Sequence, residues 1–197
     1  GAYLPDADFE AAGATIVGSA AEAFAADLVL KVQRPTAEEA ALLREGTALV
    51  SFLAPAASAD LLGALAGRKV TAFAMELVPR TTKAQSMDAL SSQATIAGYK
   101  AVLVGADAMG RILPMLTTAA GTLAPAKVFV IGAGVAGLQA IATARRLGGI
   151  VSAFDVRAVV REQVQSLGAS FVEVAAVEGE GQGGYAKELA DEQQRRV

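Results

Sequence analysis

The sequence contains no cysteine and no histidine among its 197 residues. The missing cysteines exclude disulfides and thiolate nucleophiles, and the two absences together exclude zinc sites of the usual kind. Acid–base catalysis by histidine is excluded as well. Any chemistry in this chain therefore rests on carboxylates, amides, hydroxyls, lysine, arginine or a bound cofactor.

The sequence also has no basic excess, and we expect neither a membrane span nor a targeting leader. It has 17 Lys and Arg against 20 Asp and Glu, and the net charge of −3 does not indicate a basic surface for nucleic acid. Residues 128–144 are uncharged, but three glycines interrupt a run that is short for a bilayer core, so we expect no direct membrane insertion. The N-terminus has neither a basic leader nor an apolar signal core, which predicts a cytoplasmic protein.

Hydrophobic residues make up 53% of the chain, enough for a real core, and they are patterned as βα units. Short apolar runs alternate with helical segments, as in a parallel sheet. The predicted strands are 14–17, 28–32, 48–53 and 70–75, followed by 128–131, 149–155 and 170–174. The predicted helices are 20–26, 36–45, 59–66, 86–108, 138–147 and 158–167, with Thr36 and Ser58 as N-caps.

We therefore predict an α/β protein with two Rossmann-like, open parallel-sheet domains. A partial N-terminal domain covers residues 1–85, a linking helix and connector cover 86–125, and the first half of a nucleotide-binding domain covers 126–197. Only three strands are predicted in the second domain, whereas a dinucleotide fold pairs two βαβαβ halves. We accordingly expect both domains to be incomplete and the chain to be a piece of a longer polypeptide.

The most informative motif is Gly132-Ala-Gly134-Val-Ala-Gly137, between a predicted strand and a predicted helix. Residues 128–131 are β-branched and aromatic, which is typical of a buried parallel strand. Gly132 would allow a tight turn, Gly134 would let backbone approach a pyrophosphate, and Gly137 would let helix and strand pack closely. This context favours a dinucleotide site at the helix N-terminus over an ordinary βα turn.

Asp155 supplies the acidic residue that such a site needs. It ends the next predicted strand, about 20 residues after the glycines, as the dinucleotide fingerprint expects. Its carboxylate would accept hydrogen bonds from both hydroxyls of an adenosine ribose and would repel a 2′-phosphate. The sequence thus predicts NAD(H), although Arg157 just after the strand is a residue type that binds 2′-phosphates.

A second polar cluster comprises Arg80, Gln85, Asp88 and Ser91. Its simplest interpretation is a surface turn, with Ser86 as the N-cap of the helix that follows. Asp88 and Ser91, however, are three residues apart and would share one helix face, with Arg80 and Gln85 just before them. Such a set can hold a carboxamide, which presents one acceptor oxygen and two N–H donors.

Residues 80–99 resemble the Arg-Gln-Asp loop of the NAD(H)-binding component of proton-translocating nicotinamide nucleotide transhydrogenases. Further segments fall in the family's order and spacing, so the resemblance covers nearly the whole chain. These segments are Met115-Leu-Thr-Thr-Ala-Ala-Gly-Thr, Pro125-Ala-Lys, the glycine motif, Ala153-Phe-Asp-Val-Arg and Gly184-Tyr-Ala-Lys-Glu-Leu.

The resemblance implies direct hydride transfer between NADH bound here and NADP(H) bound to a partner component, while a membrane-spanning component moves a proton. By that resemblance, Arg80, Asp88 and Ser91 position the nicotinamide carboxamide and Gln85 aligns the second nucleotide. Arg80, Gln85 and Asp88 are thereby the expected catalytic set. The family also suggests a homodimer at the cytoplasmic face of the membrane.

The remaining roles that the resemblance implies concern the rest of the dinucleotide. Gly134, Val135 and Ala136 would carry the pyrophosphate, and Asp155 the adenosine ribose. Tyr185 would belong to a mobile loop that closes over the nucleotide, since glycine fills four of the seven positions 178–184 before the predicted helix 185–195. Without the resemblance, Tyr185 is as well explained as an anchor at the start of that helix.

Two rival functions remain open. An alanine dehydrogenase shares the two-domain plan, but it carries a catalytic histidine that this sequence lacks. A noncatalytic NAD-binding module would keep the glycine motif and Asp155, yet would have no need of the polar cluster that ends at Ser91.

Overall fold

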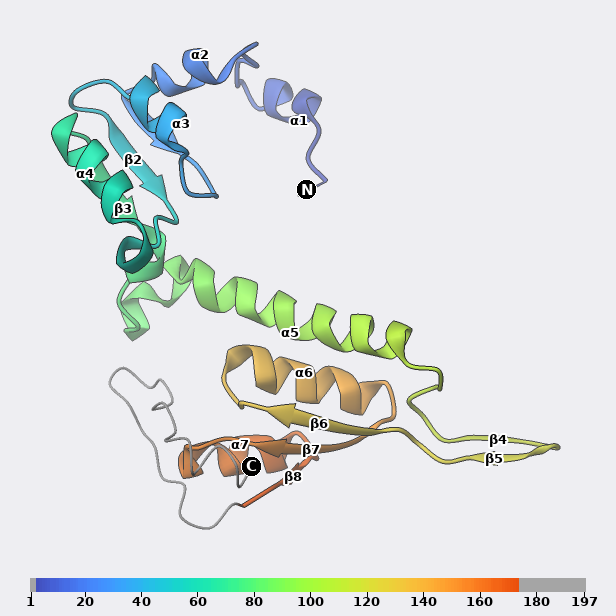
Figure 1. Ribbon diagram of the computed structural model, residues 1–197. Coiled ribbons are helices and arrows are strands. Elements are labelled where there is room, and N and C mark those ends of the chain that lie inside the picture. The colour runs from blue at the N-terminus through green and yellow to red at the C-terminus, as the bar shows by residue number, and fades with distance from the viewer. Residues whose placement is uncertain (1–2, 174–197) are drawn as a thin grey trace. The chain divides into compact units, whose positions relative to one another are not determined.

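The computed structural model describes residues 3–173. The chain divides into two compact units, Gly1–Ala89 and Leu90–Val197. Each unit contains a three-stranded parallel sheet (Figure 1), as the predicted α/β class requires. Over this described range, no helix combines the length and the apolarity that a bilayer crossing needs.

The first unit is a parallel sheet of strand order β1-β2-β3, in which Val29 pairs with Leu49 and Val50 with Phe73. Its strands are β1 (Leu28–Leu30), β2 (Ala48–Ser51) and β3 (Thr71–Ala74). Its helices are α1 (Asp6–Ala11), α2 (Ala20–Phe24), α3 (Ala37–Leu42) and α4 (Ala59–Gly67). Fully buried leucines, including Leu43 and Leu49, form the core between helices and sheet.

The helix starts of this unit follow the predicted caps only in part. Thr36 forms a capping box: its hydroxyl accepts from the Glu39 N–H at 3.2 Å, and its own N–H donates to the Glu39 carboxylate at 2.8 Å. Ser58 occupies the N-cap position of α4, but its side chain makes no capping bond. It accepts a hydrogen bond from Arg34 instead, at 2.6 Å.

The strand predicted at 14–17 is wrong. The segment is irregular, and Ile16 and Val17 are exposed rather than paired in the sheet. The Ala14 N–H donates to the Phe9 carbonyl and so closes the end of α1. The β-branched residues of this segment favour an extended chain, but without a neighbouring strand that preference produces no ladder.

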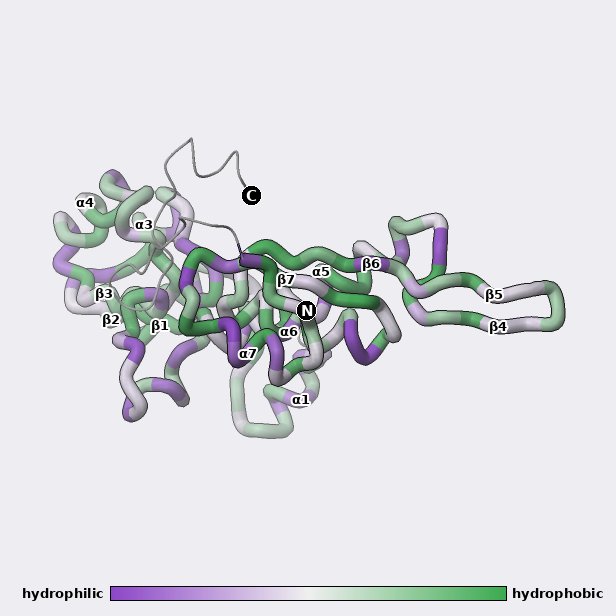
Figure 2. The backbone as a smooth tube through the Cα atoms, turned by 90° about the horizontal axis from the view of Figure 1, so that it is seen from below, coloured by the Kyte–Doolittle hydropathy of each residue, from purple (hydrophilic) through white to green (hydrophobic). Residues whose placement is uncertain are grey.

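The second unit is a parallel sheet of order β6-β7-β8 with helices packed on one face. Its strands are β6 (Lys127–Ile131), β7 (Ile150–Phe154) and β8 (Ser170–Phe171), and its helices are α5 (Ala89–Ala108), α6 (Val135–Arg146) and α7 (Arg161–Ser166). The fully buried Ile141 of α6, Val151 of β7 and Val164 of α7 centre its core. Figure 2 shows the hydrophobic run along β6.

Two predictions for this unit need correction. Strand β6 is buried on one face only, because Val128 and Val130 pack against the core while Phe129 and Ile131 are exposed. Within the predicted connector 111–125 the chain forms an antiparallel hairpin of β4 (Leu116–Thr118) and β5 (Gly121–Leu123) (Figure 1). Its strands have three residues each, too few to show a periodicity in the sequence.

Candidate functional site

The glycine motif forms the turn between β6 and α6. Gly132, the residue after the strand, has a φ of +92°, a left-handed conformation that side chains other than glycine rarely adopt. A Cβ at Gly137 would lie 2.8 Å from the carbonyl carbon of Gly132 and closer still to its oxygen. The tight turn at Gly132 and the close packing at Gly137 are therefore confirmed.

The turn leaves backbone N–H groups directed away from the helix. Gly134 is the N-cap of α6, and the Leu138 N–H donates to the Gly134 carbonyl at 2.8 Å to close the first helical turn. The N–H groups of Val135, Ala136 and Gly137 consequently have no acceptor within the helix. The first turn of α6 holds no acidic residue, and Arg145 and Arg146 lie in its last turn. Anions are thus favoured at its start.

The backbone at Gly134 is not covered by a neighbouring side chain. A Cβ built on Gly134 would meet nothing nearer than the guanidinium Nη2 of Arg157, at 4.0 Å. The glycine thus leaves the backbone at the start of α6 open, with the guanidinium of Arg157 beside it. The donors present, backbone N–H groups and an arginine, are those that phosphates prefer.

Asp155 lies directly after β7 and is bound to this turn. Its Oδ2 accepts the Ala133 N–H at 2.7 Å and the Arg157 Nη2 at 3.0 Å. Its Oδ1 accepts the backbone N–H of Arg157 at 2.8 Å and the Nε of the same residue at 2.9 Å. The carboxylate therefore joins the ends of β6 and β7, and its side chain is only 3% exposed.

The charge on Asp155 is stabilised by these partners. Burial raises the pKa of the Asp155 carboxyl, but the Arg157 guanidinium, the Ala133 N–H and the Arg157 N–H together lower it more, so the pKa lies below its usual value. The carboxylate is therefore ionised at neutral pH and pairs with Arg157. The sequence motif identified both residues, but it indicated Arg157 only as a phosphate ligand and not as the ion-pair partner of Asp155.

The residues of the polar cluster divide between the two units. Arg80, Gln85 and Asp88 belong to the first unit, and Ser91 belongs to the second, together with the glycine turn and Asp155. Gln85 lies exposed in a 3₁₀ turn, Thr82–Met87, and Asp88 and Ser91 are half-buried.

The predicted N-cap of the long helix is wrong. Ser86 lies inside the 3₁₀ turn, and α5 begins only at Ala89. Asp88 accordingly precedes the helix, with a ψ of 76°, and Ser91 lies in its first turn. The buried Ala84 anchors the 3₁₀ turn, and no break in the local composition separates this turn from the helix.

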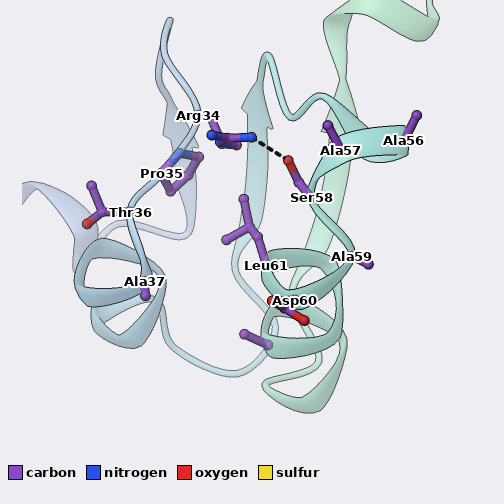
Figure 3. A pocket seen from close by; sticks show the side chains of 11 residues that line it. Arg34, Pro35, Thr36, Ala37, Ala56, Ala57, Ser58, Ala59, Asp60 and Leu61 are labelled. Atoms are coloured by element: carbon purple, nitrogen blue, oxygen red, sulfur yellow. Dashed lines mark hydrogen bonds between the residues drawn. The ribbon is translucent and has the colours of Figure 1, made fainter.

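Tyr185, the loop 178–184 and the predicted helix 185–195 lie outside the described residues. A cavity of about 700 Å³ occurs elsewhere, in the first unit, between the starts of α3 and α4 (Figure 3). Arg34 and Ser58 face each other across it and are joined by their hydrogen bond. None of the predicted site residues lines this cavity.

Both halves of the chain match domains of one known protein family. The alanine dehydrogenase/PNT N-terminal domain matches residues 1–97, and the alanine dehydrogenase/PNT C-terminal domain matches residues 101–194. The chain belongs to this family. The resemblance to transhydrogenases drawn from the sequence motifs is thereby confirmed, together with its link to alanine dehydrogenase.

Within the family, transhydrogenases are the more similar relatives. An NAD(P) transhydrogenase subunit alpha polypeptide of Rhodospirillum rubrum is 54% identical over 98% of this chain and 52% of its own. The crystal structure of transhydrogenase from Sinorhizobium meliloti aligns with a TM-score of 0.84 at 55% identity, over 89% of this chain and 52% of that one. The Mycobacterium tuberculosis alanine dehydrogenase is 39% identical over 79% of this chain and 43% of its own.

The chain spans about half the length of these transhydrogenase relatives. The matched half includes every predicted site residue, from Arg80 to Tyr185.

Proposed function

We propose that this chain is the NAD(H)-binding part of a transhydrogenase, in which hydride passes directly from NADH to NADP⁺ on a partner component. The observation that carries the proposal is the glycine turn with Asp155 bound to it, on a chain 54% identical to an NAD(P) transhydrogenase subunit alpha. In the complete assembly the transfer is coupled to proton movement through a membrane-spanning component.

The chain's own residues bind and orient the dinucleotide. Gly134, Val135 and Ala136 present N–H groups to the pyrophosphate at the start of α6, and Arg157 lies close enough to add a charge. Asp155 accepts the hydroxyls of the adenosine ribose. When NADH is bound, its nicotinamide ring supplies the hydride. Hydride transfer between two nicotinamides needs no acid or base from the protein, and the missing histidines and cysteines are consistent with that.

The polar cluster aligns the nicotinamide. Arg80, Asp88 and Ser91 hold the carboxamide, and Gln85, in its exposed 3₁₀ turn, assists the approach of the second nucleotide. Donor and acceptor carbons must come within about 3–3.5 Å, so small displacements of these side chains slow the transfer. Tyr185 belongs to the loop that excludes water from the pair.

The assembly requires partners. We propose an NADP(H)-binding component, a membrane-spanning proton-channel component and a second copy of this chain, with the whole chain peripheral on the cytoplasmic side. The rival functions are an alanine dehydrogenase and a noncatalytic NAD-binding module.

Hydride exchange decides between these functions. The chain is mixed with NADH, the NADP(H)-binding component and an oxidised NAD analogue whose reduced form absorbs at a distinct wavelength. Reduction of the analogue supports the transhydrogenase. Oxidation of alanine with NAD⁺, or reductive amination of pyruvate with NADH and ammonia, in the absence of the partner component would establish the dehydrogenase instead. NADH binding without either reaction would leave only the binding module.

Gln85→Asn tests the alignment role. We expect hydride exchange to slow at least tenfold while NADH affinity changes less than about threefold, because the shorter amide still hydrogen-bonds but no longer reaches the same point. Stopped-flow absorbance and equilibrium fluorescence measure the two effects. Gln163→Asn in α7, outside the cluster, is the matched control and should change neither. Equal losses of rate and affinity in Gln85→Asn would refute the alignment role.

A further inference from the structure

Helix α5 touches the dinucleotide turn directly, through a glycine in its middle. A Cβ added to Gly98 would lie 3.1 Å from the Cα of Ala136 and 2.9 Å from its carbonyl carbon, and closer still to the carbonyl oxygen. Ala136 lies in the first turn of α6, between the second and third glycines of the motif. The backbones of α5 and α6 therefore meet at the point where the pyrophosphate is proposed to bind.

Gly98 lowers the stability of helix α5, and its close contact with Ala136 explains why a glycine stands there. Glycine inside a helix is about 0.5–1 kcal/mol less favourable than alanine. Gly98 is nevertheless the buried residue of α5, and Val102, one turn further on, packs against the core of the second unit. Gly105, on the same helix, is exposed, and a Cβ there would meet nothing within 4 Å. Only the first of these two glycines is needed for a close approach.

The same helix carries Ser91 on the same face. Residues 91 and 98 are seven apart, which places them two turns apart along one side of an α-helix, about 10 Å by a rise of 1.5 Å per residue. Thr95 lies between them, with its hydroxyl donating to the Ser91 carbonyl at 3.2 Å. The distance between the backbones of α5 and α6 at Gly98 and Ala136 therefore determines how far Ser91 lies from the glycine turn.

We propose that Gly98 is a positioning residue that fixes the distance between the nicotinamide end and the pyrophosphate end of the NADH site. The inference rests on the proposed function, because it assigns the two ends of that site to Ser91 and to the start of α6. Gly98 touches no part of the nucleotide itself; it acts through the helix on which Ser91 lies.

A methyl group at Gly98 moves α5 rather than α6. Helix α6 is held by the fully buried Ile141 and Ala144 and by the close contact of Gly137 with Gly132. Helix α5 has most of its side chains exposed or half-buried and yields first. The pyrophosphate turn and Asp155 consequently stay in place, while Ser91 is displaced from them.

The experiment compares NADH with ADP, which carries the adenosine and the pyrophosphate but no nicotinamide. In Gly98→Ala we expect NADH affinity to fall at least tenfold and ADP affinity to change less than about twofold, measured by calorimetry on the whole chain. In Gly105→Ala both affinities should stay as in the wild type. A purely structural role would lower the stability of Gly98→Ala without changing the ratio of the two affinities.

The other outcomes overturn the inference. Equal losses for NADH and ADP would mean that α6 is the helix that moves, and unchanged affinities would mean that the contact has no bearing on the site. If Gly98→Ala does not fold, Val102→Ala loosens α5 without a clash, and the ratio of NADH to ADP affinity should then fall about threefold; an unchanged ratio refutes the proposal. Failure of the proposed function would show separately, as a wild-type chain that binds neither ligand.

Discussion

The two carboxylate oxygens of Asp155 hold the folded turn, and the same oxygens would bind the ribose in the proposed complex. A carboxylate offers about four acceptor positions, and the Ala133 N–H and Arg157 engage it through four hydrogen bonds. The Ala133 N–H belongs to the turn itself, so in the proposed complex ribose hydroxyls would gain access only if the Arg157 guanidinium withdrew. If Asp155 binds the ribose as proposed, the affinity for NADH includes the free energy of breaking this ion pair.

Asp155→Asn tests the ribose contact while keeping the volume of the side chain. We expect NADH affinity to fall about 10- to 100-fold, because hydrogen bonds to a charged acceptor contribute about 1.5–3 kcal/mol. Calorimetry measures the loss, and Glu162→Gln, an exposed carboxylate on α7, is the control that should leave affinity unchanged. Wild-type affinity in Asp155→Asn would remove this residue from the ribose site.

The same carboxylate predicts a pH dependence of stability. Because the pKa of folded Asp155 lies below its value of about 3.9 in the unfolded chain, its contribution is complete above that pH and is lost as the pH falls through the lower, folded pKa. Urea unfolding from pH 6 to pH 3 checks this. The difference in unfolding free energy between wild type and Asp155→Asn should shrink on acidification; a constant difference would contradict the ion pair as its source.

Among the helices, α3 and α4 begin with a hydroxyl residue but use it differently. Thr36→Ala removes a capping bond and should cost about 1 kcal/mol of unfolding free energy. Ser58→Ala is the matched comparison at the same position of α4, where the side chain makes no capping bond. It should cost less, because the Arg34 that it pairs with stays accessible to water. If urea unfolding gave equal losses of unfolding free energy for the two variants, the capping box would contribute no extra stability.

The elements that could be predicted from the sequence are those whose residues agree with their surroundings. Strand β7 follows from an apolar run, and α6 from its glycines and alanines, because each has a neighbour with which to pack. Segment 14–17 has the same local preference but no partner strand. The β4–β5 hairpin could not be predicted because cross-strand contacts hold it together. One of them is the hydrogen bond between the hydroxyl oxygens of Thr117 and Thr122, which are 3.1 Å apart.

The site divides in the same way. The turn at Gly132 and Gly137 was predictable, since both constraints act within a few residues of the chain. The contact between Gly98 and Ala136 was not, because it joins two helices; the one signal in the sequence was a glycine in the middle of a helical segment. The side-chain direction of Arg157 depends on the buried carboxylate beside it, which only the fold reveals.

For the chain as a whole, the balance of charge works against binding a dinucleotide. The net charge is −3, so an anionic ligand gains no attraction at long range and depends on local groups. In the proposed complex, the N-terminus of α6 and Arg157, once released from Asp155, would supply positive charge at the pyrophosphate, and Asp155 would supply negative charge where a 2′-phosphate would lie. If these roles hold, this chain should discriminate between NADH and NADPH by a single carboxylate.

Thermal unfolding with each nucleotide tests this discrimination. A ligand at 100 times its dissociation constant stabilises the folded chain by about 2.7 kcal/mol, so NADH should raise the unfolding temperature clearly, and NADPH at the same concentration should raise it much less. Asp155→Asn removes the repulsion and should bring the two shifts closer together, mainly by weakening the effect of NADH. Glu162→Gln should keep the wild-type difference. In the wild type, NADPH could instead raise the unfolding temperature as much as NADH does. That result would show that Arg157 turns away from Asp155 and binds the 2′-phosphate, so that the carboxylate does not select the nucleotide.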